Sequence, residues 1–130
     1  MMYDRRSKYL LGKQGEETAA EYLTAKGFRV IKCNYRGTHG EIDVIAWEQE
    51  TLVFVEIKTS KSSRYGAPET WVTPRKQKRM ARTALKFIHE NHLEHHAVRF
   101  DVVAIDLRTG RHEIRHIVNA FWMPDMGGYF

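Results

Sequence analysis

Hydrophobic residues recur with two different spacings along this chain of 130 residues. The stretch from His39 to Lys58 reads HGEIDVIAWEQETLVFVEIK, two apolar runs joined by a polar tip at residues 48–51. Short apolar runs bounded by polar residues predict two strands, which here form a hairpin. Because both runs carry apolar residues on both faces, we expect layers of structure to cover both sides of this hairpin.

Helical spacing of apolar residues, and residues that typically begin or end helices, predict the other elements. Ala19, Ala20 and Leu23 form the core face of a first helix, which Gly27 ends. Thr73 followed by proline is a strong helix start. The expected elements are a helix over 13–26, a strand over 28–35, the hairpin, a helix from Thr73 to Asn91 and strands over 99–106 and 111–118.

Four charged residues interrupt the apolar hairpin. Since strand side chains alternate between faces, Glu41 and Asp43 share a face of the first strand, and Glu56 and Lys58 share a face of the second. A loop centred between residues 49 and 50 places positions that sum to 99 opposite each other, so Asp43 faces Glu56 and Glu41 faces Lys58. Two opposed carboxylates repel by about 1 kcal/mol or more. A hard divalent cation such as Mg²⁺, which prefers oxygen ligands, would compensate.

The same residues resemble a known superfamily. The aspartate at 43 and the triplet EIK at 56–58 resemble the core of the PD-(D/E)XK nucleases, with Glu-Ile where the superfamily has proline before the aspartate. The strings GKQGEETAAEYL, GEIDVIA and VFVEIKTS are similar to the YraN-like family of small bacterial proteins, which is thought to be related to archaeal Holliday junction resolvases. The resemblance spans residues 11–106.

The resemblance implies an α/β fold with a restriction-endonuclease-like core, a mixed central sheet of about five strands flanked by two main helices. Residues 1–130 are expected to form one domain, with a flexible basic arm over 1–10 and an apolar tail over 119–130. The tail is expected to pack on the core or to make a homodimer contact. The implied activity is that of an Mg²⁺- or Mn²⁺-dependent endonuclease, selective for structured, junction-like DNA.

The resemblance also implies roles for five residues. Asp43 and Glu56 would hold the metal, Lys58 would orient water or stabilise developing charge, and Glu16 would assist the metal from the first helix. Glu41 has two open interpretations, a further metal ligand or a partner that neutralises Lys58. Glu16 also has two open interpretations. Besides assisting the metal, it could simply be an acid in the first turn of a helix, which interacts favourably with the helix dipole.

The second predicted helix combines an apolar face with a dense run of cations. The inward positions are expected to be Gln77, Ala81, Ala84, Leu85 and Ile88. Like charges four residues apart repel each other on a helix, so six cations between residues 75 and 86 exceed what solubility requires. We interpret them as a face that follows a phosphate backbone, against the alternative of an ordinary solvated surface. The predicted nucleic-acid-binding residues here are Arg75, Lys76, Lys78, Arg79 and Arg82, with Lys86 completing the stripe.

Several further residues are secondary candidates. Lys61 and Arg64 lie in the loop after the hairpin, which either contacts the nucleic acid or is a plain surface connection. His39 beside the hairpin either touches phosphate or water or is a solvated loop residue. Gln77 resembles a glutamine that some superfamily nucleases carry near the active site. Asp101, at the head of a strand, either supports the site or, as is usual for such acids, faces solvent.

Composition narrows the class of protein. The chain is 42% hydrophobic and 28% charged, with a net charge of +5 and a pI near 9.4, which favours an anionic partner such as nucleic acid. The resemblance to junction resolvases implies DNA rather than RNA. The single Cys33 excludes an internal disulfide. The sequence has no apolar run long enough to span a membrane. We therefore expect a cytoplasmic location and no membrane partner. Two other functions are open: a nucleic-acid-binding protein that cleaves nothing, and an interaction protein whose acids and lysine form a structural ion-pair network.

Overall fold

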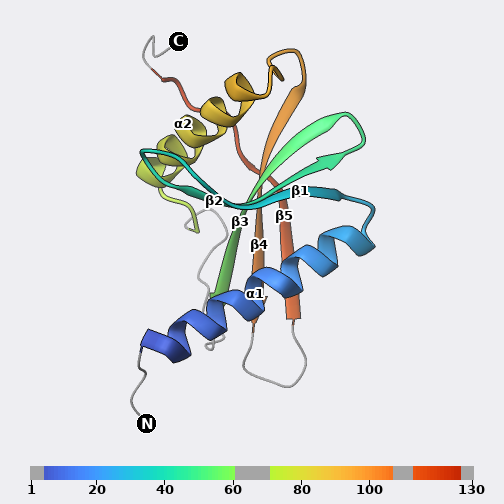
Figure 1. Cartoon of the computed structure of the whole chain (residues 1–130), viewed down its shortest axis with the longest axis vertical. Helices are drawn as coiled ribbons and strands as arrows, with labels where there is room; N and C mark the ends of the chain where they lie inside the picture. Colours follow the sequence, from blue (N-terminus) through green and yellow to red (C-terminus); the bar gives the residue numbers. More distant parts are fainter. Residues whose placement is uncertain (1–4, 61–70, 107–112, 127–130) are drawn as a thin grey trace.

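The computed structural model describes residues 5–60, 71–106 and 113–126. Two helices and five strands make up this part of the chain (Figure 1). In chain order they are α1 (Arg5–Ala25), β1 (Arg29–Arg36), β2 (Glu41–Glu48), β3 (Thr51–Ser60), α2 (Pro74–Glu90), β4 (Ala97–Asp106) and β5 (Glu113–Phe121).

The five strands form one mixed sheet in the order β1-β2-β3-β4-β5. The pairings are antiparallel except for β3 with β4, which are parallel and joined through α2. In the hairpin, Val44 lies opposite Val55 and Glu48 lies opposite Thr51. These pairs confirm the predicted register, in which opposite positions sum to 99. The predicted mixed α/β sheet with two helices is therefore confirmed.

Alternation along the strands separates two apolar cores, one under each helix. Val53 and Val55 of β3 pack with Ala19 and Leu23 of α1. Phe54, on the other face of β3, packs with residues of α2. Because β3 contributes large buried side chains to both cores, it carries Glu56 and Lys58 into the centre of a three-layered structure (Figure 1).

The start of α2 is the one that the sequence predicts. Thr73 is the N-cap, its Oγ1 accepting a hydrogen bond from the backbone N–H of Lys76 at 3.3 Å. The helix has Pro74 as its first residue and Asn91 as its C-cap. Its inner face is only partly as expected, since Gln77 and Leu85 are half-buried. The fully buried positions are Met80, Ala81, Thr83, Ala84, Phe87 and Ile88.

Two boundaries differ from the sequence-based expectation. Helix α1 begins at Arg5 rather than at residue 13 and so includes residues 5–10 of the segment expected to be an arm. Gly12 lies within it, because a single glycine lowers helix stability by about 1 kcal/mol without ending a helix. At the other end, β5 continues into the expected tail as far as Phe121, whose ring stacks on that of Phe100 with centroids 4.6 Å apart. Neither described helix is long and apolar enough to span a membrane.

Candidate metal centre and nucleic-acid interface

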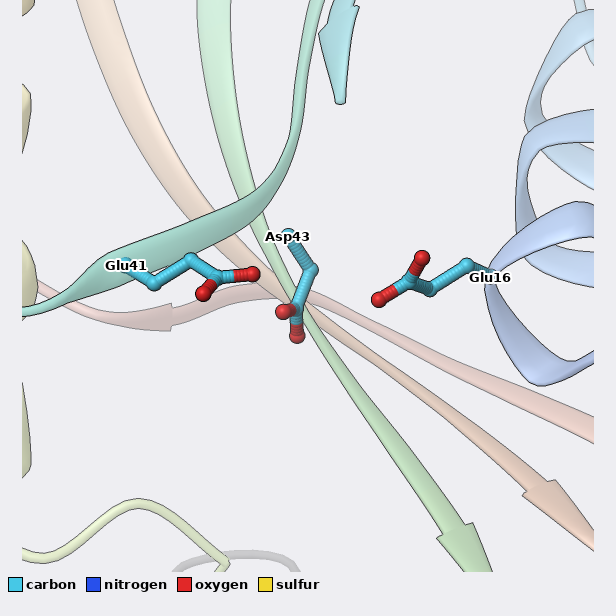
Figure 2. A group of neighbouring side chains, drawn as sticks. All are labelled: Glu16, Glu41 and Asp43. Atoms are coloured by element: carbon cyan, nitrogen blue, oxygen red, sulfur yellow. The ribbon is translucent and has the colours of Figure 1, made fainter. Parts of the chain in front are cut away.

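Three acids from two elements converge beside the sheet. Glu16 projects from α1, and Glu41 and Asp43 project from β2. Each offers a carboxylate oxygen, and these oxygens all lie within 4.8 Å of one another. Figure 2 shows Asp43 between the other two side chains. An all-oxygen group of this kind has the chemistry that Mg²⁺ and Mn²⁺ select.

A close approach of α1 to β3 brings Glu16 to this cluster. A Cβ added at Gly15 would overlap Cγ2 of Thr59, so only glycine allows the helix to lie this close to the strand. Asn34 Nδ2 then donates a hydrogen bond to Glu16 Oε2 at 3.1 Å. Asn34 has a φ of 54°, a left-handed conformation that asparagine adopts more readily than most residues. The position of Glu16 is thus set by the close packing of α1 on β3 and by the hydrogen bond from Asn34.

Asp43 is the most strongly perturbed acid of the cluster. Burial and the nearby charge of Glu56 raise its pKa from 3.8 to about 7, with smaller contributions from Glu16 and Glu41. The backbone N–H of Ile57 opposes this shift by donating to Asp43 Oδ2 at 2.8 Å. At neutral pH the site therefore favours a proton or another cation on Asp43.

Glu56 lies in the same cavity but makes a different contact from the one predicted. The cavity measures about 510 Å³ and is lined on one side by Glu41, Asp43 and Glu56. The Nζ atom of Lys76, on α2, lies 2.5 Å from Glu56 Oε1. Glu56 is outside the group of mutually close acids, and the strand pairing of β2 with β3 ends one residue before it, at Val44 and Val55.

The expected contact between Glu41 and Lys58 is replaced by another. Glu41 Oε2 lies 3.3 Å from Nε of Arg36, its neighbour across β1 and β2. The Arg36 side chain is highly exposed, so this pair contributes little to stability. Lys58 is half-buried on β3 and is not among the described residues that line the acidic cavity. Glu41 is thus paired with Arg36 and clustered with Glu16 and Asp43, and its role as a metal ligand stays a prediction.

The cations of α2 face the acids and continue past them. Arg75, Lys76 and Arg79 also line the acidic cavity, as do His39, Gly40, Thr73 and Met80. A second cavity, of about 500 Å³, lies alongside. Its described lining consists of Thr38, His39, Arg75, Lys78, Arg79 and Arg82. The predicted basic residues of α2 therefore gather at two adjoining cavities.

The loop between β1 and β2 is packed tightly against this helix. The N–H of Gly37 donates to the carbonyl of Gly40 at 2.8 Å, which closes the turn. A Cβ at Gly37 would lie 3.2 Å from Cγ2 of Thr83 on α2, closer than ordinary contact. The turn holds His39 at the rim of both cavities. His39 is thus beside the acids, as the sequence predicts, whereas its contact with phosphate stays a prediction.

Other predicted residues lie elsewhere. Gln77 donates from Nε2 to the carbonyl of Val72 at 3.0 Å, which stabilises the start of α2, and it is not among the described residues of the acidic cavity. Lys61 and Arg64 lie outside the described residues.

Asp101 is buried, contrary to the expectation that it faces solvent. It is 0% exposed and accepts hydrogen bonds from Arg99 at 2.9 and 3.0 Å and from the backbone N–H of Asn119 at 2.9 Å. His116 Nε2 lies 2.8 Å from Asp101 Oδ2, and Tyr22 of α1 contacts the other ring nitrogen. Arg99 belongs to the same strand as Asp101, whereas His116 and Asn119 come from β5 and Tyr22 from α1. The charged residues Arg99 and Asp101 within an apolar strand are the only local sign of this network in the sequence.

Comparison with known proteins identifies relatives over most of the chain. The sequence model described as uncharacterised protein family UPF0102, the YraN-like family, matches residues 15–105. A UPF0102 protein of Pelobacter propionicus is 45% identical over 113 residues, which cover 85% of this chain and 81% of that protein. One of Syntrophomonas wolfei is 40% identical over 111 residues, covering 85% and 96%. One of Prosthecochloris aestuarii is 45% identical over 118 residues, covering 86% and 93%.

Proposed function

The chain belongs to the uncharacterised protein family UPF0102, and we propose that it is a metal-dependent nuclease that hydrolyses phosphodiester bonds of nucleic acid. One observation carries the proposal. Glu41 and Asp43, which cluster with Glu16, line a cavity together with Glu56 and with the cations Arg75, Lys76 and Arg79 of α2. A site with acids on one side and cations on the other suits a phosphodiester, which needs both a metal and neutralisation of its own charge.

The three clustered acids fit a divalent cation. They offer oxygen ligands only, and the raised pKa of Asp43 reflects its burial and the charges of the neighbouring carboxylates. Glu16, Glu41 and Asp43 would hold Mg²⁺ or Mn²⁺, and Glu56, whose charge acts on Asp43, would be a further ligand if Lys76 left it. Bound there, the metal would supply a nucleophilic water and neutralise charge on the phosphate.

The chain's own residues would position the substrate. Arg75 and Arg79 line the acidic cavity and are placed to pair with phosphate oxygens. Lys58 follows Glu56 by two residues on β3, and although it does not line the acidic cavity in the described structure, it would orient water or stabilise the developing charge once substrate is bound. Glu56 holds Lys76 at the cavity wall, where the ammonium can meet a phosphate that enters. Base-specific contacts are not required by this arrangement, which suits selection by nucleic-acid shape.

A cleavage assay tests the proposal. Labelled four-way junctions, flaps, single strands, duplex DNA and structured RNA are incubated with Mg²⁺ or Mn²⁺. We expect metal-dependent cutting that Asp43→Asn and Lys58→Met each reduce at least a hundredfold, because each variant keeps side-chain size but removes a charge. Glu17→Gln is the matched control, since Glu17 is exposed on the same turn of α1 as Glu16. Salt-sensitive binding without cutting would instead favour the non-catalytic binding protein.

A further inference from the structure

The two cavities beside α2 differ sharply in chemistry although they adjoin. They share His39, Arg75 and Arg79 as lining residues. The acidic cavity also has three carboxylates in its wall. The second, which we call the cationic cavity, has four cations, one hydroxyl and one imidazole in its described lining and no acid. A ligand of the cationic cavity should therefore be an anion.

The cations of this cavity are arranged along one line of the helix. Arg75, Lys78, Arg79 and Arg82 follow at spacings of three and four residues, which puts neighbouring charges on the same face, where they repel. Among the described residues, Arg75, Lys78 and Arg79 form no salt bridge. The first turn of α2 contains no acid either. The helix thus carries a repulsion that a bound anion would relieve.

We propose that the cationic cavity binds the phosphate group next to the one held at the acidic cavity. The proposal rests on the proposed nuclease function and deepens it by naming the substrate class, a polynucleotide with at least two successive phosphates. Guanidinium groups match phosphate oxygens in pairs, and the Thr38 hydroxyl can donate a further hydrogen bond. Because Arg75 and Arg79 line both cavities, phosphates in the two cavities would be neighbours along one strand.

This arrangement has a consequence for small substrates. A dinucleoside monophosphate can place its phosphate at the acids but leaves the cationic cavity without a ligand. A dinucleotide that carries a second, terminal phosphate can fill both cavities. The affinity for a dinucleotide should therefore depend on its second phosphate. It should also depend on the cations that line the cationic cavity but not the acidic cavity. Lys78 and Arg82 are those cations.

Binding of short ligands in Ca²⁺ tests the proposal without requiring cleavage. The probes are a dinucleoside monophosphate and its two derivatives with a terminal phosphate at the 5′ or the 3′ end, titrated calorimetrically. We expect one derivative to bind the wild-type protein at least tenfold more tightly than the monophosphate. In Lys78→Gln/Arg82→Gln this advantage should fall below threefold. Lys78→Gln alone is a second variant, because Lys78 is exposed and its replacement leaves the packing of α2 unchanged.

Lys32→Gln is the charge-matched control, since Lys32 is exposed on β1 and lines neither cavity in the described structure. It should keep the full advantage of the second phosphate. Equal affinity of the wild type for all three probes, no binding of any probe, or an advantage that survives in both Lys78 variants would overturn the subsite. A confirmed advantage in a protein that cuts no substrate would leave the subsite standing and reject the nuclease function alone.

Discussion

The Nζ atom of Lys76 lies 2.5 Å from Oε1 of Glu56, so an ammonium of α2 neutralises the acid that the sequence places opposite Asp43. The remaining acids, Glu16, Glu41 and Asp43, are left clustered beside this pair. The ion pair with Lys76 therefore competes with any use of the Glu56 carboxylate as a metal ligand. This contact links the cationic helix directly to the acidic cluster.

Replacement of Lys76 by methionine should tighten metal binding. The change removes a positive charge from the lining of the acidic cavity and frees Glu56 as a ligand. We expect the Kd for Ca²⁺ to fall about five- to tenfold, the effect of roughly 1 kcal/mol of electrostatic interaction. Isothermal titration calorimetry without nucleic acid measures this, with Lys78→Met as the control for a general loss of charge. An unchanged or higher Kd in Lys76→Met would show that Lys76 does not compete with the metal.

The raised pKa of Asp43 predicts a pH-dependent gain in stability for Asp43→Asn. The folded state binds this proton more tightly than the unfolded state, so the stability that the group contributes is complete below about pH 4 and is lost as the pH rises through about 7. Without metal, the free energy of unfolding of Asp43→Asn at pH 8 should therefore be about 2 kcal/mol higher than that of the wild type, after allowance for partial solvent screening.

Urea unfolding at several pH values measures this difference. It should grow between pH 4 and pH 8 and shrink when Mn²⁺ is added, since the metal stabilises only the wild type. A difference that stays constant over this pH range would mean that Asp43 is ionised in the folded protein throughout.

Gly15→Ala should destabilise the protein and weaken the metal site. The added Cβ overlaps Thr59 Cγ2, and the helix must move away from β3, at a cost of about 1–3 kcal/mol. Glu16 moves with the helix, so Mn²⁺ affinity should fall as well. Thr59→Ser removes the overlapping methyl group, and the double variant Gly15→Ala/Thr59→Ser should recover most of both losses. If the double variant recovered neither loss, the effect of Gly15→Ala would not come from overlap with the Thr59 methyl group.

Asp101→Asn should be strongly destabilising. Although burial raises the pKa of Asp101, hydrogen bonds from His116, Arg99 and the Asn119 N–H outweigh it and hold the pKa below 3.8. The stability that this group contributes is thus present above about pH 4 and is lost as the pH falls further. We expect a cost of about 3 kcal/mol at pH 7. The control is Glu50→Gln at the exposed hairpin tip, which should change stability little. A cost that is equally large at pH 3 would rule out the ionised form of Asp101 as its source.

Local patterns were sufficient to predict much of this fold. The symmetric spacing of the hairpin determines its register, and threonine followed by proline determines the start of α2. Glu16 could be placed on the inward face of α1 because Ala19 and Leu23 share that face. The acids of the cluster were thus all identified as candidates before the structure, and their roles at a metal stay predictions.

Contacts between distant elements could not be predicted in the same way. The pairing of Lys76 with Glu56 depends on how α2 docks over β3, and the approach of Gly15 to Thr59 depends on the angle of α1. The burial of Asp101 depends on β5, which supplies His116. No periodicity within one segment encodes such contacts, because each is set by the packing of two segments that are far apart in the chain.

The central claim is that Glu16 and its two neighbours form a divalent-metal site, and titration with Mn²⁺ followed by electron paramagnetic resonance tests it most directly. We expect the wild type to bind Mn²⁺ at this site and Glu16→Gln to weaken binding at least tenfold. Replacement of the neighbouring exposed acid, in Glu17→Gln, should leave the Kd unchanged. Equal Mn²⁺ affinity in the wild type and Glu16→Gln, or no binding by the wild type, would contradict this claim.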